Sequence, residues 1–175
     1  MRLAYWAVST VSASYDLLRA EPFFDGLSDW QLERLAMHAQ RSMFHAGNRV
    51  FREADEADRM WLIVTGRVAV ITDVPGRGEV VIDTLGPGAV LGWSWLVPPH
   101  RWRFSARAIE TTLTVELDGS SVRELCQNDL GLGFQFSLAV IRVVSDRLEA
   151  TRRRLATGCD TEGGDQVLQV GQEDD

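Results

Sequence analysis

The chain of 175 residues has little of the chemistry that metal sites, disulfides and membrane spans require. Its two cysteines, Cys126 and Cys159, have no Cys or His neighbour at metal-ligand spacing. Isolated thiols of this kind are typical of a reducing compartment and predict no disulfide. Arg142 interrupts the apolar run 138–144, and Ser and Thr follow the apolar patch 3–8 too early for a signal peptide. We therefore expect a cytoplasmic protein that does not cross a membrane.

Lysine is absent, and all 18 basic residues are arginines. We attribute this bias to genomic base composition rather than to function. The 25 acidic residues give a formal net charge of −7. Non-specific nucleic-acid binding needs a positive surface. We therefore expect no direct binding to DNA.

The sequence also lacks the motifs of common enzyme classes, including a Gly-rich phosphate loop and a nucleophile elbow. A cupin-like enzyme needs His and carboxylate ligands on neighbouring strands. The three histidines, His38, His45 and His100, form no His-x-His pair, and His38 belongs to a predicted helix. We predict that the protein is not an enzyme and holds no metal, with a small cupin-like enzyme as the least favoured alternative.

Composition divides the chain into three parts. Residues 1–21 show no clear period and are predicted to form an arm or a short helix. Residues 22–155 have the length of one domain with a single core. Residues 156–175 are acidic, rich in glycine and poor in aromatics, so we predict a disordered tail.

The domain begins with a helix and continues as short strands. Ser28 is the predicted N-cap, with Gln31 completing a capping box, and apolar residues follow at helical spacing at Leu32, Leu35, Ala36 and Ala39. From residue 41 to residue 117, short apolar runs alternate with Gly, Pro and Asp. The predicted strands are 49–51, 60–65, 68–72, 80–85 and 113–117, with a hairpin turn at 75–78.

Helical spacing returns at 120–127 and again from 129 to 155. We therefore predict a mainly β protein with flanking helices, in which a double-stranded, jelly-roll-like β-roll is followed by a long C-terminal helix. That helix carries a seam with alternating steps of three and four, namely Ile141, Val144, Leu148, Thr151 and Leu155. Such a seam can wrap around a partner helix. The alternative is that it packs on the roll.

Three segments together resemble the cyclic-nucleotide-binding domain of the catabolite-activator (Crp/Fnr) type. They are the run 62–70 with its turn at Gly66, the run 85–92, and a seventeen-residue cassette, 92–108, that closes on Arg107. The resemblance covers about residues 22–155. It implies a free-standing β-roll with a phosphate-binding cassette, acting as a regulatory or sensor module in signal transduction. It also implies a homodimer through the long helix, and we expect the family's helix-turn-helix to be absent.

The cassette keeps the backbone features of the resembling family. Gly88 and Gly92 are expected to adopt backbone conformations that other residues resist, so that the chain can approach a ligand. One turn glycine of the family is replaced by Ala54.

The two charged residues that grip the nucleotide in that family are both replaced. Trp93 stands at the place of the Glu that binds the ribose hydroxyl, and Trp102 at the place of the Arg that pairs with the cyclic phosphate. Each such hydrogen bond to a charged group contributes about 1.5–3 kcal/mol. Losing both weakens binding by about two to four decades. A cyclic nucleotide therefore stays a candidate ligand, with an affinity of about millimolar unless other residues compensate.

Compensating contacts define the candidate site. An Arg beside Trp102 could reach a phosphate, although neighbours of an inward-facing residue on a strand point outward. Thr151 falls where the family's long helix contacts the base. The candidate ligand-binding residues are Gly92, Trp93, Ser94, Trp95, Arg101, Trp102, Arg103, Ser105 and Thr151, and the dimer seam is Ile141, Val144, Leu148 and Leu155.

Two interpretations of Trp93, Trp95 and Trp102 stay open. The indoles either line a pocket for a flat, nucleotide-like ligand, or fill the space that a nucleotide would occupy. In the second case the protein is a ligand-free interaction module for another protein. We favour the open pocket, because Arg101, Arg103 and Arg107 crowd around the same loop.

Overall fold

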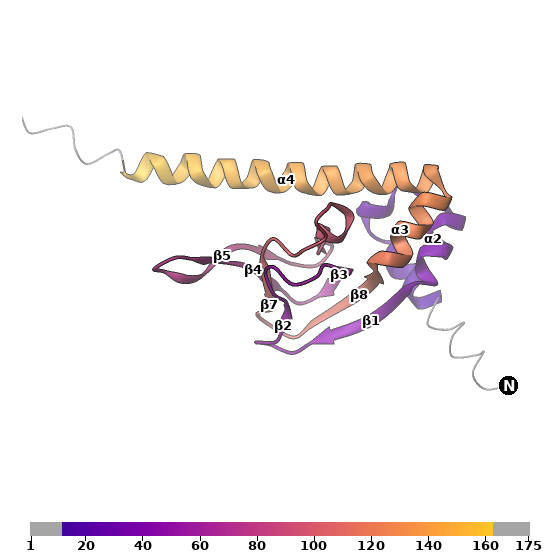
Figure 1. The fold of residues 1–175 in the computed structure, drawn as a ribbon, viewed down its shortest axis with the longest axis horizontal. Helices are drawn as coiled ribbons and strands as arrows, with labels where there is room; N and C mark the ends of the chain where they lie inside the picture. The colour runs from indigo at the N-terminus through magenta and orange to yellow at the C-terminus, as the bar shows by residue number, and fades with distance from the viewer. Residues whose placement is uncertain (1–11, 163–175) are drawn as a thin grey trace, which may run out of the picture. The chain divides into compact units, whose positions relative to one another are not determined.

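The structure is a computed structural model that describes residues 12–162. Residues 12–19 are helical and lead into the 3-10 turn η1 (Pro22–Phe24). The elements that follow, labelled in Figure 1 where there is room, are α2 (Asp29–Ala36), β1 (Ala39–Phe44), β2 (Arg49–Phe51), β3 (Arg59–Thr65), β4 (Val68–Val74), β5 (Gly78–Leu85), β6 (Val90–Leu91), the 3-10 turn η2 (Ser94–Leu96), β7 (Ser105–Ala108), β8 (Thr112–Asp118), α3 (Gly119–Asn128) and α4 (Leu130–Glu162).

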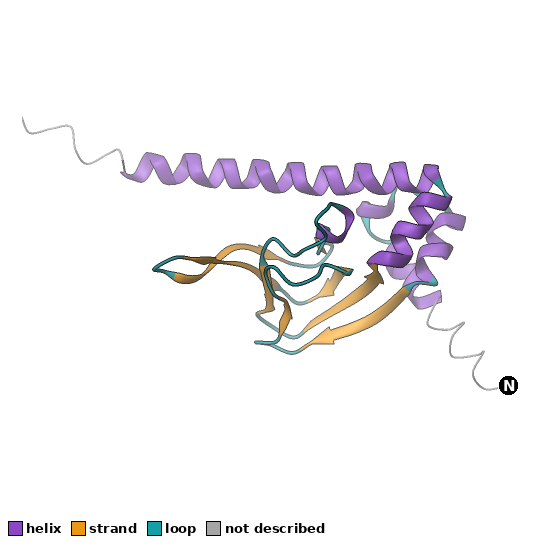
Figure 2. Ribbon diagram, in the orientation of Figure 1, coloured by secondary structure: helices purple, strands orange, loops and turns teal. Residues whose placement is uncertain are grey.

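The strands form two four-stranded sheets in which every pairing is antiparallel. One sheet has the order β1-β8-β3-β6 and the other β2-β7-β4-β5. Figure 2 colours the strands orange and the helices purple. The apolar runs at 60–63 and 68–71 are buried, as expected for strands covered on both faces. Each strand predicted from the sequence is present, and the predicted β-roll with flanking helices and a long C-terminal helix is confirmed.

Helices α2 and α3 lie together at one end of the roll (Figure 1). The predicted capping box at the start of α2 is confirmed: Ser28 Oγ accepts a hydrogen bond from Gln31 N at 3.4 Å, and Gln31 Oε1 accepts one from Ser28 N at 3.1 Å. The prediction that Ala39 continues this helix is wrong. Ala39 begins β1, opposite Leu117 of β8. Pairing along the whole of β1 outweighs a helical spacing that would add one weakly apolar residue.

The structure describes part of each segment that flanks the predicted domain. Within the N-terminal segment, residues 12–19 are helical and Leu18 is completely buried. Helix α4 is described to Glu162, and the disorder of the tail 156–175 stays a prediction. Propagating an existing helix is much easier than nucleating one, so polar residues can extend it. The predictions for residues 1–11 and 163–175 lie outside the described residues.

The chain divides after Val140 into two compact units, Met1–Val140 and Ile141–Asp175. The first unit contains the roll and the cassette, and the second contains the predicted seam. Among residues 12–162, no helix combines the length and the apolar character that a membrane span requires.

Candidate functional site

Glycines allow the cassette backbone to pass close to its neighbours. Gly88 and Gly92 have φ of +79° and +81°, which confirms the expected left-handed conformations. A Cβ atom on Gly92 would lie 3.1 Å both from the Arg59 carbonyl oxygen and from the Trp102 ring. Ala54, at the place of the family's turn glycine, has a φ of +69°. Residue 54 therefore has a positive φ although its side chain is not that of a glycine.

Backbone hydrogen bonds join residues 100–102 of the cassette to the loop 54–57. Trp102 N donates to Asp55 O at 3.0 Å, Ala54 N donates to Trp102 O at 2.8 Å, and Ala57 N donates to the carbonyl oxygen of His100 at 2.8 Å. These bonds fix the backbone of Trp102 against the loop 54–57. They decide where its side chain can point.

The Trp102 indole is buried inside an aromatic cluster. Its side chain is 4% exposed, and its ring stacks on Phe51 with centroids 4.1 Å apart and planes inclined by 19°. The Trp61 ring lies 5.8 Å away, and Trp61 in turn stacks on Phe51 at 5.6 Å. For Trp102 this geometry favours the alternative interpretation, in which the indole fills space inside the roll.

The other two indoles differ from each other. Trp95 in η2 is completely buried, with its ring 5.9 Å from Phe136 and packed against Gly119. Trp93, directly before η2, is only half-buried. Of the three, Trp93 therefore keeps the accessible surface that contact with a ligand requires.

Two of the three arginines that favoured an open pocket have partners elsewhere. Arg101 donates to Ala54 O at 2.8 Å. Arg107 and Arg49 both pair with Glu79, at 2.5 and 2.7 Å. Hydrogen bonds from Arg49 and then Arg107 hold the pKa of Glu79 below its ordinary value. Arg101 and Arg103 are both exposed, but residue 102 lies before β7 begins at Ser105, so strand alternation does not account for their exposure.

The remaining candidate residues are polar and scattered. Ser94 is half-buried at the start of η2. Ser105 Oγ accepts a hydrogen bond from Glu53 N at 3.0 Å, which ties β7 to the neighbouring loop. Thr151 donates to the Arg147 carbonyl one turn earlier and belongs to the second unit. Contacts of these residues with a ligand stay predictions.

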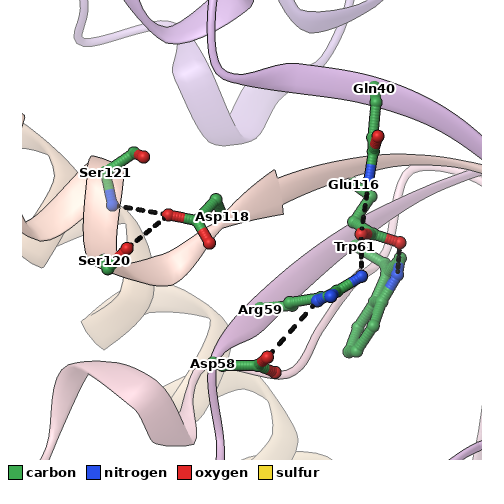
Figure 3. Close-up of polar contacts among 8 residues, drawn as sticks. All are labelled: Gln40, Asp58, Arg59, Trp61, Glu116, Asp118, Ser120 and Ser121. Atoms are coloured by element: carbon green, nitrogen blue, oxygen red, sulfur yellow. Dashed lines mark hydrogen bonds and ion pairs between the residues drawn. The ribbon is translucent and has the colours of Figure 1, made fainter.

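A carboxylate that the sequence did not single out anchors the aromatic cluster. Glu116 Oε2 accepts a hydrogen bond from Trp61 Nε1 at 2.9 Å, while Oε1 accepts from Gln40 at 2.8 Å and Arg59 at 2.6 Å (Figure 3). The side chain of Glu116 is only 7% exposed. Its position between buried Val115 and Leu117 was the available signal, because a charged residue inside an apolar strand requires partners.

The Glu116 network predicts a specific sensitivity to acid. Burial raises the pKa of Glu116, but hydrogen bonds from Gln40 and Trp61 and the charge of Arg59 together lower it below its ordinary value of 4.5. The stability that this carboxylate contributes is therefore complete above pH 4.5 and is lost as the pH falls through the lowered pKa. We expect Glu116→Gln to show a smaller loss of stability with acid than the unmodified protein, measured by urea unfolding between neutral and acidic pH.

Glu110→Gln is the matched control, because Glu110 precedes the same strand and pairs with Arg67 at the surface. This variant keeps the Glu116 network and should keep the acid profile. An acid profile of Glu116→Gln identical to that of the unmodified protein would contradict the assignment.

Comparisons with known proteins agree with this architecture. The family model of the cyclic nucleotide-binding domain matches residues 41–129. A cyclic nucleotide-binding protein from Geobacter metallireducens GS-15 is 30% identical, with a TM-score of 0.71, over 77% of this chain and 98% of that one. A cyclic nucleotide-binding domain from Methylobacillus flagellatus KT shares the fold at 20% identity and a TM-score of 0.72, over 93% of this chain and 85% of that one.

A curated relative is similar over part of its length. The CRP-like cAMP-activated global transcriptional regulator of Mycobacterium tuberculosis is 25% identical over 141 residues, which are 81% of this chain and 61% of that protein. The chain thus spans about three fifths of the length of this relative. The matched family model, the 30% identical structure and the two antiparallel sheets agree, and the chain belongs to the cyclic nucleotide-binding domain family.

Proposed function

We propose that this chain is a non-catalytic regulatory module in which an indole stands where the family's arginine meets the cyclic phosphate. The observation that carries the proposal is the packing of Trp102, which is 4% exposed, stacks on Phe51 and lies against Gly92. A buried indole offers no charge to a phosphate, and Trp93 offers none to a ribose hydroxyl. The cassette therefore operates without the family's two charged contacts.

The relatives support the regulatory part of this proposal. The mycobacterial relative is described as a cAMP-activated transcriptional regulator. Because the chain spans only 61% of that protein, its activity is carried over here as a proposal. In this proposal the roll reports the state of its cassette to a partner, and the C-terminal helix is the element that presents the signal.

We further propose that α4 joins two copies of the chain into a homodimer. The seam from Ile141 to Leu155 alternates steps of three and four, the spacing of a two-stranded coiled coil. The same spacing extends backwards to Phe134 and Leu130, which are 61% and 81% exposed in the first unit. Large exposed apolar side chains on a helix are typical of an interaction surface. In the proposed dimer, the same helix of the second copy covers these side chains.

A second candidate function is a ligand-free interaction module with a filled pocket. The complete burial of Trp95 and the burial of Trp102 favour it, whereas half-buried Trp93 favours a module that still binds a ligand. A thermal-shift screen with cyclic mono- and dinucleotides separates the two. Stabilisation by any member identifies a sensor, and stabilisation by none of them favours the interaction module.

Ordinary cyclic nucleotides are expected to bind weakly. Without the two charged contacts, cyclic AMP and cyclic GMP should bind about two to four decades less tightly than to a micromolar member of the family. Titration calorimetry with each nucleotide measures this. Low-micromolar binding of either one would show that other residues replace the lost contacts and would overturn the proposal.

A further inference from the structure

A hollow lies at the end of the roll, where α2 leads into β1 and β8 leads into α3. It has a volume of about 300 Å³, at the lower end of the range for small-molecule sites. Its lining belongs to neither the cassette nor the seam, and consists of Met37, His38, Ala39, Gln40, Arg59, Glu116 and Asp118. A buried, hydrogen-bonded carboxylate, Glu116, forms part of its wall.

The two carboxylates in this wall differ in how many of their oxygens accept hydrogen bonds. Glu116 uses both oxygens, for Gln40, Arg59 and Trp61. Asp118 uses one oxygen, Oδ1, which accepts hydrogen bonds from Ser120 Oγ at 2.6 Å and Ser121 N at 2.7 Å (Figure 3). An ionised carboxylate can accept about four hydrogen bonds. Within the described part of the chain, no donor bonds to Asp118 Oδ2, so this oxygen is available to a ligand.

The net charge of the lining residues determines whether the pocket favours a cation or an anion. The hydrogen bond from Ser120, followed by those from Ser121, lowers the pKa of Asp118, so the carboxylate is ionised at neutral pH. Glu116 is also ionised and Arg59 is cationic, which leaves the lining with one excess negative charge. No group of three His, Cys, Asp or Glu residues able to hold a metal ion occurs in residues 12–162. An organic cation fits this wall better than a metal ion or an anion.

We propose that this pocket binds a small organic cation, an ammonium or guanidinium compound, through the carboxylates of Asp118 and Glu116. N–H donors on a cation form short, charge-assisted hydrogen bonds with carboxylate oxygens, and a guanidinium can contact two oxygens at once. Arg59 pairs with Glu116 at 2.6 Å and keeps 46% of its side chain exposed, so this part of the lining is open to solvent. The proposal for this pocket does not depend on the function proposed for the cassette.

The pocket is also connected to the cassette through one side chain. Trp61 donates its indole N–H to Glu116 at the pocket wall, and its ring lies 5.8 Å from Trp102. The backbone of Arg59 meets Gly92 on the other side of the same strand. A cation bound beside Glu116 changes the electrostatic field there and therefore the environment of the Trp61 indole. Binding should change the tryptophan fluorescence as well as release heat.

The test compares N-butylguanidinium with N-butylurea, which has a similar shape and no charge, by titration calorimetry on the unmodified protein. The cation should bind at millimolar or lower concentration and the urea should not. Asp118→Asn keeps a side chain able to cap α3 and should weaken binding of the cation by about tenfold, the effect of one charged hydrogen bond. Glu110→Gln makes the same change of charge just before the other end of β8 and should leave binding unchanged.

Three results would overturn the proposal. They are equal binding of cation and urea, no binding of the cation at millimolar concentration, and unchanged binding in Asp118→Asn. A capped peptide, acetyl-Gly-Arg-Gly-amide, tests the other source of a guanidinium. If it binds more tightly than the free cation, the pocket receives an arginine side chain of a protein, and the small-molecule assignment is wrong. Cyclic-nucleotide binding does not enter any of these outcomes, so this proposal and the proposed function can fail separately.

Discussion

Replacing Trp102 with alanine is expected to destabilise the domain by about 3–5 kcal/mol, the usual cost of removing a large buried aromatic side chain. The indole is 4% exposed and stacks on Phe51 while Trp61 lies beside both rings. Its removal leaves a cavity between Phe51 of one sheet and Trp61 of the other, and a closely packed interior cannot fully refill it. Urea unfolding followed by circular dichroism measures the loss.

Trp30→Ala is the matched control, because Trp30 is 58% exposed on α2. It should cost less than about 1 kcal/mol. A loss for Trp102→Ala no larger than that of this control would show that the ring lines an open site instead of filling the roll.

The double variant Trp93→Glu with Trp102→Arg restores the family's gripping pair and gives a second measure of the same packing. A guanidinium at residue 102 would lie among aromatic rings, where its burial costs several kcal/mol even beside a carboxylate. We expect this variant to unfold or to be strongly destabilised. A folded double variant that binds cyclic AMP in a calorimetric titration would instead revive the open-pocket interpretation.

Ile141→Asp or Leu148→Asp is expected to convert the protein from a dimer into a monomer. Each substitution places an unpaired charge at a seam position where the partner helix would cover it, and the cost of burying such a charge exceeds that of a typical apolar contact. Multi-angle light scattering at high micromolar concentration measures the molecular mass. The effect should be nearly complete, because both residues lie within the run 130–155 that forms the proposed interface.

Ala150→Asp is the control for the added charge, since Ala150 lies on α4 outside the seam spacing and is exposed. This variant should stay dimeric. A monomeric unmodified protein at the same concentration would mean that the seam packs within its own chain. A monomeric Ala150→Asp variant would mean that the change of charge alone prevents pairing.

The features that depended on neighbours in the chain were predictable from the sequence. Ser28 and Gln31 lie three residues apart, so their capping box follows from local hydrogen bonding. Gly88 and Gly92 have the positive φ values that their place in the pattern indicated. The apolar runs between Gly and Pro turns likewise located every predicted strand, because burial on a strand leaves a pattern in consecutive residues.

The tertiary structure alone decided what the cassette residues contact. Phe51, Trp61 and Trp102 are far apart in the sequence, and their stacking depends on which strands pair and in which register. The same holds for Glu116, whose partners come from β1 and β3 on either side of β8. A one-residue shift of register would turn these side chains to the opposite face. Composition and spacing therefore predicted the roll, and the resemblance of three segments indicated the family, whereas the choice between a filled and an open interior depended on packing between distant strands.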